Sequence, residues 1–534
     1  MKWLNEASRL FLERDYLLPG VTPEQRIKQI SLNAERILGI PHFAEKFEYY
    51  MSLGWYSLST PVWINFGVER GLPISCFSID VQDDTADILR ASAEVGMMSK
   101  YGGGTAGFFG KLRPRGSVIK NNGTSNGSVS FMEIFEAVLN TISQGSARRG
   151  RFAAYLPTDH GDIKEFLRCR EEGNQIQELS LGVTIPEGWM QSMLDGDEYK
   201  RSIWKSIIKK REETGYPYLL FEDNVNNNKP QVYKDKDMKI QASNLCTEIL
   251  EYQNEEKSFT CCLASMNLLY WDDWKDTDAV KTLITFLDAV LTEFISKAQH
   301  LPFMEKTVRF ATEHRSIGLG VLGYHSLLQS KMIPFESIQA RNLNKMIFKN
   351  INEKSIEASR ELAAMYGEPE VLKGYGERFT TRLAIAPTTS SSFILGQVSP
   401  SIEPLASNYF IKDVAKMKVT FKNPYLDIKD WSKLRNTGGS IQHLDIDQEV
   451  KDVFKTFDEI SQMEIIIQAA DRQKFIDQGQ SLNLSIPPDV NPSDIHKLLV
   501  EAWKLGIKTL YYHRSANVAQ KVSRDLLSCT LCES

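Results

Sequence analysis

The sequence has neither an excess of charge nor a long apolar run, and each absence excludes a class of protein. Its 534 residues include 63 Lys and Arg against 68 Asp and Glu, a formal net charge of -5 at pH 7. Nucleic-acid-binding domains usually have a basic excess, so we expect no nucleic-acid partner. No apolar run approaches the ~20 residues that a bilayer span needs, so we expect no membrane partner.

Features of secreted proteins are also lacking. The start, MKWLNEASRLFLERDYLL, has charged residues among its apolar ones, unlike a signal peptide, and predicts a cytoplasmic protein. Cysteine is scarce, and an odd number in a large intracellular chain indicates buried thiols, a metal site or redox catalysis. The central cysteines fit no common zinc spacing, and the terminal CxxC has no second CxxC, so we expect no metal site. The seven are Cys76, Cys169, Cys246, Cys261, Cys262, Cys529 and Cys532.

Apolar patterning predicts an α/β fold after a helical start. Residues 1–72 read as a helical region, in which Thr22 caps a helix with Pro23 at its first position. In residues 73–516, short apolar runs alternate with longer amphipathic ones, which favours a parallel sheet or barrel. The polar residues 517–534 read as a flexible tail. The expected strands are 74–81, 151–157, 179–186, 218–223, 258–270, 382–388 and 482–487, and the expected later helices are 130–144, 279–299, 355–367 and 496–506.

One short motif, SNLCTE at 243–248, combines three chemically useful groups. In an extended segment, alternate residues point to one side, which would bring Asn244, Cys246 and Glu248 together. The set offers a sulfur, an amide that can hold a substrate hydroxyl, and a carboxylate that can act as general base if burial tunes its pKa. The alternative is a structural cysteine beside a partly exposed glutamate, since free cysteine is often a core residue.

The other cysteines leave similar alternatives. Cys76 and Cys261 lie in strand-like runs that we expect to be buried. Two thiols from separate strands either meet within disulfide distance or are inert core residues. The terminal pair, Cys529 and Cys532, is a dithiol shuttle, half of a zinc site or an accident of sequence.

Three polar loops and a tyrosine pair complete the pattern. APTTSSS (386–392) offers hydroxyls and backbone donors to a phosphate, or is a simple N-cap cluster. The glycines of YGGGTAGFFGKLRPRGS (101–117) predict a tight loop close to a ligand, although their spacing matches neither the Rossmann fingerprint nor the P-loop. SQGSARRGRF (143–152) suits a nucleotide or a mobile gate. The tyrosine pair, Tyr511–Tyr512, lies in an apolar run, where adjacent tyrosines are usually core or interface residues.

In this order, the motifs resemble the large, catalytic subunit of class I ribonucleotide reductase over residues 50–534. The specific features are SNLCTE, the GGG loop, PTTSSS followed by SIEP at 401–404, the tyrosine pair before HRS, and the terminal cysteine pair. The resemblance implies a ten-stranded α/β barrel with Cys246 on a central finger loop. Cys246 would become the thiyl radical that removes the 3′ hydrogen of the ribose. Glu248 would deprotonate the 3′ hydroxyl, and Asn244 would hydrogen-bond the sugar.

The same resemblance implies a redox cycle and a separate partner. Cys76 and Cys261 would become a disulfide, which the terminal cysteine pair would reduce before thioredoxin or glutaredoxin reduces that pair. The tyrosine pair would relay the radical from the metallocofactor of a small subunit, within an α2β2 complex that contains a homodimer of this chain. No covalently bound cofactor is implied. The expected substrates are ribonucleoside diphosphates, held by Thr60, Ser75, Cys76, Gly104, Asn244, Cys246, Glu248, Thr388, Thr389, Ser390 and Ser391.

An effector site is implied as well. Asp83, Arg113 and Ile119 match the site where ATP or a deoxynucleotide, with Mg, selects the substrate. Gln144 and Arg148 match the loop that relays this choice. Larger family members begin with an ATP-cone domain, for which this sequence leaves no room before the helical region. We therefore expect a compact form that dATP does not shut off.

Three other classes of protein are alternatives to a class I reductase. An adenosylcobalamin-dependent reductase shares the barrel and the three cysteines, but a cofactor bound beside the cysteine needs no tyrosine relay. A glycyl-radical enzyme of the same barrel is disfavoured because the tail contains no glycine. A non-catalytic nucleotide-binding regulator would be favoured if a key Cys, Asn, Glu or Tyr were missing, and none is.

Overall fold

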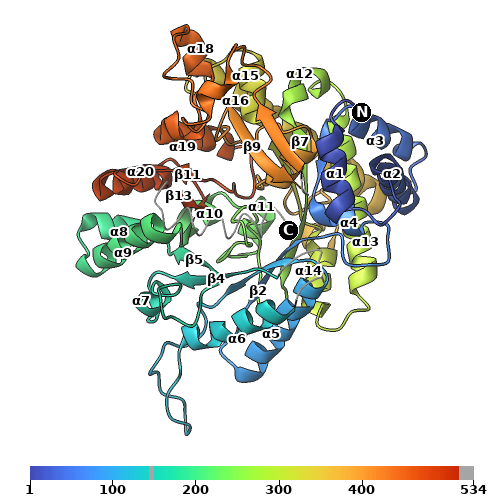
Figure 1. Ribbon diagram of the computed structural model, residues 1–534. Coiled ribbons are helices and arrows are strands. Elements are labelled where there is room, and N and C mark those ends of the chain that lie inside the picture. The colour runs from blue at the N-terminus through green and yellow to red at the C-terminus, as the bar shows by residue number, and fades with distance from the viewer. Residues whose placement is uncertain (143–149, 415–416, 516–534) are drawn as a thin grey trace.

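The computed structural model describes residues 1–142, 150–414 and 417–515. A curled sheet runs through the middle of the molecule, and helices pack around its outside (Figure 1). The N-terminal helices lie together at one side, on the right of this view.

The N-terminal part is helical, as predicted. Its elements are α1 (Glu6–Asp15), α2 (Pro23–Leu38), α3 (Phe43–Ser52), β1 (Tyr56–Leu58) and α4 (Thr60–Asn65). Thr22 caps α2 by accepting a hydrogen bond from the Gln25 N–H, and the Gln25 side chain accepts one from the Thr22 N–H. The apolar face of α2, with Ile27 and Ile30, is buried in the same core as the barrel.

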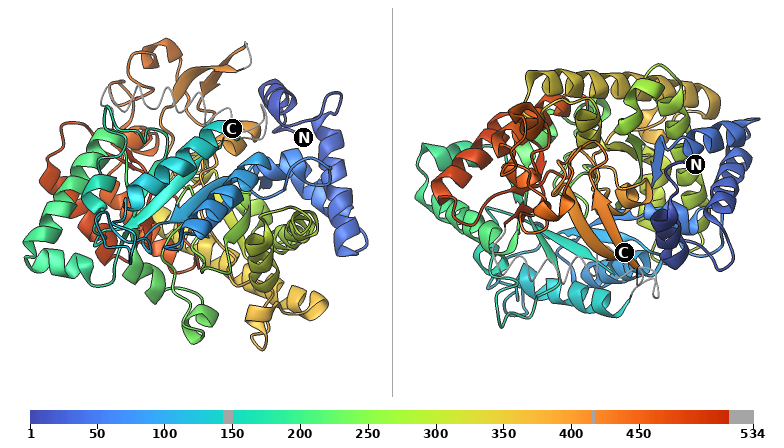
Figure 2. Two further views of the ribbon diagram at one scale, coloured as in Figure 1. Left: turned by 90° about the horizontal axis from the view of Figure 1, so that it is seen from below. Right: turned by 45° about the horizontal axis from the view of Figure 1, so that its top comes forward.

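Five parallel strands form one half of the sheet. They are β2 (Cys76–Asp80), β3 (Gly104–Phe108), β4 (Phe152–Pro157), β5 (Ser180–Ile185) and β6 (Tyr218–Phe221), paired in that order. Their residues are almost all buried, as expected of parallel strands covered on both faces. The connections include α5 (Thr85–Lys100), α6 (Ser128–Thr141) and α9 (Glu198–Thr214). Helices α5 and α6 lie side by side against the sheet in Figure 2.

A second set of extended segments, again parallel to one another, closes the sheet into a ring. Its members are β7 (Phe259–Asn267), β8 (Ile317–Leu322), the segment 383–385, the segment 480–485 with β11 (Leu484–Ser485), and the segment 509–514 with β12 (Thr509–Leu510) and β13 (His513–Arg514). Single bridges join β8 to 383–385 and that segment to 480–485, and β11 pairs with β13. β7 runs antiparallel to β2, and β12 runs antiparallel to β6. Each half contributes five members, which confirms the predicted ten-stranded α/β barrel.

Long helices cover the second half. α13 (Ala279–Ala298) packs on β7 and on α16 (Ile338–Tyr366). A hairpin of β9 (Tyr409–Val414) and β10 (Met417–Lys422) lies in front of the barrel in Figure 1. The remaining α-helices are α7 (Ile163–Phe166), α8 (Trp189–Asp195), α10 (Glu222–Asn227), α11 (Gln231–Asp235), α12 (Trp271–Trp274), α14 (Glu305–His314), α15 (Tyr324–Ser330), α17 (Thr389–Ile394), α18 (Gln448–Val453), α19 (Gln462–Gln473) and α20 (Pro492–Lys504).

Several strands lie where the sequence did not predict strands, and β3 and β8 are the two that contain glycine. The others are β1, β9, β10, β12 and β13. β3 falls within the stretch expected to be a tight glycine loop, so that expectation is wrong for residues 104–108. A Cβ on Gly107 would lie 2.7 Å from Phe152 Cζ, and one on Gly318 would lie 2.5 Å from Leu263 Cδ2. Close packing therefore requires glycine at these positions, although glycine is disfavoured in strands.

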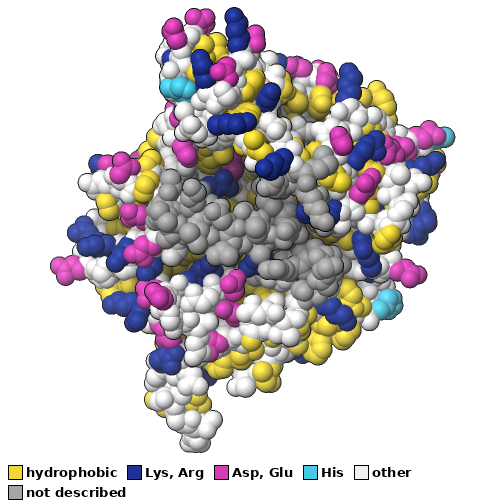
Figure 3. Space-filling view, viewed as in Figure 1, with side chains coloured by type: hydrophobic (Ala, Val, Ile, Leu, Met, Phe, Trp, Pro, Cys, Tyr) yellow, Lys and Arg dark blue, Asp and Glu magenta, His cyan; other side chains and the backbone are white. Residues whose placement is uncertain are grey.

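The surface agrees with the small net charge. Acidic and basic side chains are interspersed over the described part of the face shown in Figure 3. Among the described residues, no helix combines the length and the apolar character that crossing a membrane requires.

Candidate active site

The segment 243–250 enters the barrel as a finger-like loop, and both halves of the barrel hold it. From β4 in the first half, the Tyr155 hydroxyl donates to the Asn244 carbonyl oxygen at 2.8 Å. From the second half, the Gly479 N–H donates to the Glu248 carbonyl oxygen at 2.8 Å. These contacts from opposite sides fix the tip of the loop between the two halves.

The tip of the loop is a turn, which corrects one expectation. Thr247 has a positive φ of 71°, so the motif is not extended. Alternation along a strand therefore does not bring Asn244, Cys246 and Glu248 together. The turn does so instead: the Ser481 hydroxyl bonds both the Cys246 carbonyl oxygen and, at 3.0 Å, the Glu248 carboxylate.

Cys246 lies at the end of a line of tyrosines. The Tyr511 hydroxyl donates to Cys246 Sγ at 3.5 Å. The ring centroids of Tyr511 and Tyr512 are 4.1 Å apart, and the Tyr512 hydroxyl bonds that of Tyr216 at 3.2 Å. Burial raises the pKa of Tyr511 well above its ordinary value, so this phenol keeps its proton at neutral pH. One-electron oxidation of such a phenol releases a proton as well, and the contact with sulfur allows a hydrogen atom to pass between the two side chains.

Cys76 and Cys261 lie directly opposite each other on β2 and β7. Opposed residues of antiparallel strands have Cα atoms about 4.5–5.5 Å apart, which falls within the range of roughly 4.4–6.8 Å that a disulfide needs. The two sulfurs are not joined by a disulfide in this structure. The Asn244 amide donates to Cys76 Sγ at 3.6 Å, so the pair adjoins the finger loop. The register therefore permits a reversible disulfide beside Cys246.

Glu248 is buried, and burial raises its pKa to about 7. Hydrogen bonds from its own backbone N–H and from the side chains of Asn244 and Ser481 lower the pKa in part. Near neutral pH the carboxyl therefore exists in both protonation states, as a general base requires.

Three other predicted substrate-binding residues lie at or near the ends of the strands β1, β2 and β3. The Ser75 hydroxyl is 3.7 Å from Cys76 Sγ, and the Gly104 N–H donates to the Ser75 carbonyl oxygen at 2.6 Å. Thr60 begins α4, just after β1, and its hydroxyl bonds that of Tyr16 at 3.0 Å. Ser75 and Gly104 therefore adjoin the cysteine pair, whereas Thr60 lies beside the end of α1.

The hydroxyl-rich stretch leads into α17. Thr388 is buried, and its hydroxyl accepts a hydrogen bond from the Ser401 N–H at 2.7 Å. Thr389 is exposed, and Ser390 and Ser391 are half-buried, so their hydroxyls remain available. Helix α17 contacts α1 and β1, which places it on the same side of the barrel as α4.

Two of the predicted effector residues lie together in the structure. The Arg113 guanidinium pairs with the Asp83 carboxylate at 2.6 Å. Ile119 lies farther along, in the loop between β3 and α6 that projects at the bottom of Figure 1. Gln144 and Arg148, like the terminal cysteine pair, lie outside the described residues.

Sequence reasoning missed two residues beside the tyrosine pair. The ring centroids of Tyr218 and Tyr511 are 4.7 Å apart, and those of Tyr216 and Tyr512 are 5.4 Å apart. The pattern TGYPYLLF, with alternate tyrosines leading into a strand, is the signal that could have revealed them. Cys262 points away from the site, because its Sγ bonds the Leu287 carbonyl oxygen of α13 at 3.5 Å.

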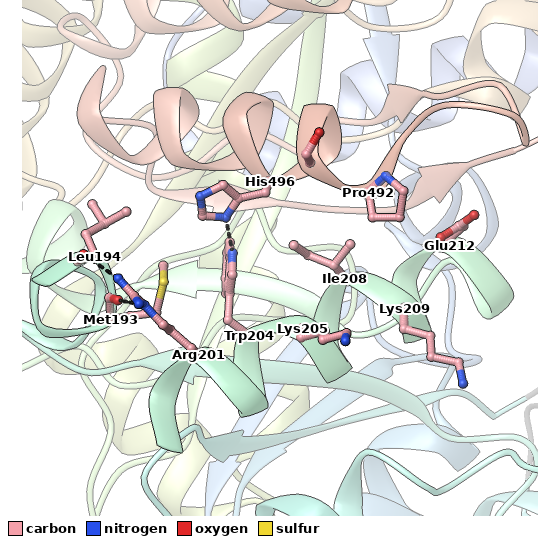
Figure 4. Close-up of a pocket in the computed structure, with 11 residues that line it drawn as sticks. Met193, Leu194, Arg201, Trp204, Lys205, Ile208, Lys209, Glu212, Pro492 and His496 are labelled. Atoms are coloured by element: carbon pink, nitrogen blue, oxygen red, sulfur yellow. Dashed lines mark hydrogen bonds between the residues drawn. The ribbon is translucent and has the colours of Figure 1, made fainter. Parts of the chain in front are cut away.

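A groove of about 670 Å³ lies among α8, α9 and α20 (Figure 4). Trp204 and Ile208 supply apolar surface, and Lys205 and Lys209 also line it. The Trp204 indole N–H donates to His496 Nδ1 at 2.9 Å and joins α9 to α20 across the groove.

Comparisons with known proteins identify the family. The family model of the ribonucleotide reductase barrel domain matches residues 74–201, 199–372 and 369–513. A Frog virus 3 protein named putative ribonucleoside-diphosphate reductase large subunit is 34% identical, over 93% of this chain and 93% of that protein. The ribonucleoside-diphosphate reductase large chain of Schizosaccharomyces pombe is 31% identical, over 96% of this chain and 74% of that protein.

A solved structure shows the same fold at higher identity. The class Id ribonucleotide reductase alpha subunit of Actinobacillus ureae is 50% identical, with a TM-score of 0.92, over 98% of this chain and 99% of that one. The chain therefore belongs to the ribonucleotide reductase family, as a large, catalytic subunit.

Proposed function

We propose that this chain reduces ribonucleoside diphosphates to 2′-deoxyribonucleoside diphosphates, with Cys246 as the radical-bearing residue. The observation that carries the proposal is the distance of 3.5 Å between the Tyr511 hydroxyl and Cys246 Sγ. Transfer of a hydrogen atom from the thiol to an oxidised Tyr511 would leave the radical on sulfur. The names of the relatives specify a diphosphate and support that substrate.

Each neighbouring residue then has a defined task. The Cys246 radical removes the 3′ hydrogen, while Glu248 takes the proton of the 3′ hydroxyl and Asn244 holds the sugar. Cys76 and Cys261 together give two electrons and two protons, so the 2′ hydroxyl leaves as water and the two sulfurs join. Cys246 finally returns its hydrogen to C3′, which restores the radical for transfer back along the tyrosine pair.

The oxidant for this relay is a metal-containing cofactor of a separate small subunit, and we propose that this subunit docks in the groove of α8, α9 and α20. Helix α9 leads to Tyr216, and α20 leads to the tyrosine pair, so an occupant of the groove is held near the outer end of the relay. The apolar surface of Trp204 and Ile208, with Lys205 and Lys209, fits an apolar segment that carries acidic residues. Ile208→Glu should weaken association at least about tenfold, because burying an unpaired charge is unfavourable. An unchanged Kd by calorimetry would place docking elsewhere.

We also propose the finer parts of the regulatory and redox cycle. Arg113 and Asp83 hold a nucleoside triphosphate effector with Mg²⁺, and the loop that contains Gln144 and Arg148 relays its identity to the substrate site. The terminal cysteine pair passes electrons from thioredoxin or glutaredoxin to the active-site disulfide. The working complex is α2β2, in the cytoplasm.

Turnover of CDP and CTP by the complex with each candidate small subunit and dithiothreitol tests the proposed activity. We expect dCDP from CDP when the correct small subunit is present. Reduction of CTP alone would contradict the diphosphate assignment. Equal activity without any small subunit would contradict the relay.

A further inference from the structure

Glu251 is a buried carboxylate behind the active site, and it has no role in the proposed reduction of the ribonucleotide. Its side chain is fully inaccessible to solvent. The hydroxyls of Ser316 and Thr381 both donate to its Oε1, and the Tyr233 hydroxyl donates to its Oε2 at 2.6 Å. Tyr233 also bonds His314 Nδ1 at 2.9 Å. Such a connected network in a low-dielectric interior couples the protonation of its members.

This network reaches the active-site cysteine Cys261. β7 and β8 pair with Cys262 opposite Ile317, so Ser316 lies beside Cys261. Burial raises the pKa of Cys261 well above its ordinary value, and a side-chain hydrogen bond from Ser316 acts in the opposite direction. A continuous path therefore runs from Glu251 through one hydroxyl to this sulfur.

Reduction of the active-site disulfide creates a need for an acid at this position. Cys76 is 9% exposed and Cys261 is 0% exposed, so an external thiolate reaches Cys76 first. Its attack forms a bond to Cys76 Sγ and breaks the sulfur–sulfur bond, and the electron pair remains on Cys261 Sγ. A thiolate enclosed in apolar surroundings is strongly disfavoured, so this leaving group must gain a proton.

We propose that the protonated Glu251 carboxyl is the source of this proton, which reaches Cys261 through the hydroxyl of Ser316. Glu251 acts through Ser316 and does not itself touch the reducible sulfur. The inference rests on the proposed pairing of Cys76 and Cys261. For this step the Ser316 hydroxyl turns from Glu251 to Cys261, and the protonated Glu251 donates to Ser316 Oγ. The Glu251 proton then moves to Ser316 Oγ as the Ser316 proton moves to Cys261 Sγ, which leaves one thiol and one carboxylate. The second thiol of the reductant then displaces Cys76, which takes a proton from solvent, and Glu251 regains its own proton before the next cycle.

The electrostatic surroundings support an acid that works near neutral pH. Burial raises the pKa of Glu251 to about 7, although the surrounding hydroxyls lower it, and Asp477 raises it further. His314, at the far end of the network, is neutral because burial, Lys257 and Lys236 hold its pKa well below the usual value. Glu251 therefore keeps its proton below pH 7 and loses it as the pH rises through 7.

The test follows reduction of the disulfide by dithiothreitol in a chain that carries Cys529→Ser and Cys532→Ser, so that the change in the thiol count comes from the Cys76–Cys261 pair. One turnover of CDP with the small subunit oxidises the pair, and the thiols that dithiothreitol restores are titrated after denaturation. The rate for the parent chain is divided by the concentration of dithiothreitol thiolate, because that concentration itself rises with pH. We expect this normalised rate to fall as the pH rises through about 7. Glu251→Gln should slow reduction about 100-fold near pH 6.5, at the lower end of typical acid–base contributions, and remove this pH dependence.

A matched control is Glu94→Gln. Glu94 is also buried, has a pKa raised by burial to about 7 and accepts a hydrogen bond from Ser258, but it lies on α5 and has no assigned role. It should leave the rate and its pH dependence unchanged. Ser316→Ala keeps the Glu251 carboxyl but removes the bridging hydroxyl, so its disulfide should be reduced as slowly as that of Glu251→Gln. This variant replaces Glu251→Gln in the test if Glu251→Gln does not fold.

The outcomes separate this inference from the proposed function. Parent-like rates and pH profiles in both Glu251→Gln and Ser316→Ala would overturn the inference. If the parent itself loses no thiols on turnover, the Cys76–Cys261 pairing in the proposed function fails instead.

Discussion

Glu248→Gln is expected to abolish activity and, at alkaline pH, to stabilise the protein. Burial raises the pKa of Glu248 to about 7, against an ordinary value of 4.5, so folding favours the neutral form. That stability is fully present below pH 4.5 and is lost as the pH rises through 7. At about 1.4 kcal/mol per pKa unit, the loss reaches about 3 kcal/mol at pH 8. Glutamine stays neutral at every pH and avoids this loss.

The activity changes in the opposite sense. Only the carboxylate form of Glu248 can accept the proton, so the parent rate should rise roughly tenfold between about pH 6 and pH 8. Glu248→Gln should lose at least about 100-fold at every pH. The assays are dCDP formation across this range and urea unfolding at about pH 5 and pH 8. Retained turnover, or a variant less stable than the parent at the higher pH, would refute the reasoning.

Cys246→Ser is expected to abolish turnover while leaving nucleotide binding intact, because a serine O–H bond is much stronger than a thiol S–H bond. Any deoxynucleotide formed by this variant would exclude a radical on that residue. Tyr511→Phe and Tyr512→Phe should each abolish turnover with the small subunit yet change the free energy of unfolding by only about 1 kcal/mol. Near-normal rates would favour a structural role for the pair. Cys529→Ser combined with Cys532→Ser should prevent repeated turnover with thioredoxin but allow a first turnover from reduced enzyme, and dithiothreitol should restore part of the rate. Full steady-state activity with thioredoxin would exclude the shuttle.

The sequence was informative about chemistry because reactive residue types are visible directly. The motif around Cys246 and the run around Cys76 were identified by residue type and order. The barrel was implied by the resemblance, and most of its strands were visible as apolar runs. The meeting of Cys76 with Cys261 depends on the register of β2 and β7, which are far apart in the chain, and only the structure supplies it.

The features that were missed have physical causes. β3 and β8 did not read as strands because close neighbours leave no room for a Cβ on Gly107 or Gly318, and the glycines conceal the apolar pattern. The finger loop was expected to be extended because propensity cannot show that contacts from both halves of the barrel stabilise a turn with a positive φ at Thr247. The sequence does not reveal the environment of Glu251, because its hydrogen-bond network joins four separate segments that only the closed barrel brings together.

The antiparallel seam between β2 and β7 has a mechanical consequence. A disulfide between Cys76 and Cys261 would join the two halves of the barrel covalently and close a loop of about 185 residues. By the chain-entropy model, such a cross-link opposes unfolding by about 5 kcal/mol. Each catalytic cycle would thus stabilise the barrel when the disulfide forms and remove that stabilisation when it is reduced. The melting temperature would therefore depend on the redox state of the two cysteines. The melting temperature of enzyme oxidised by one turnover should exceed that of the reduced enzyme, and Cys76→Ser should remove the difference.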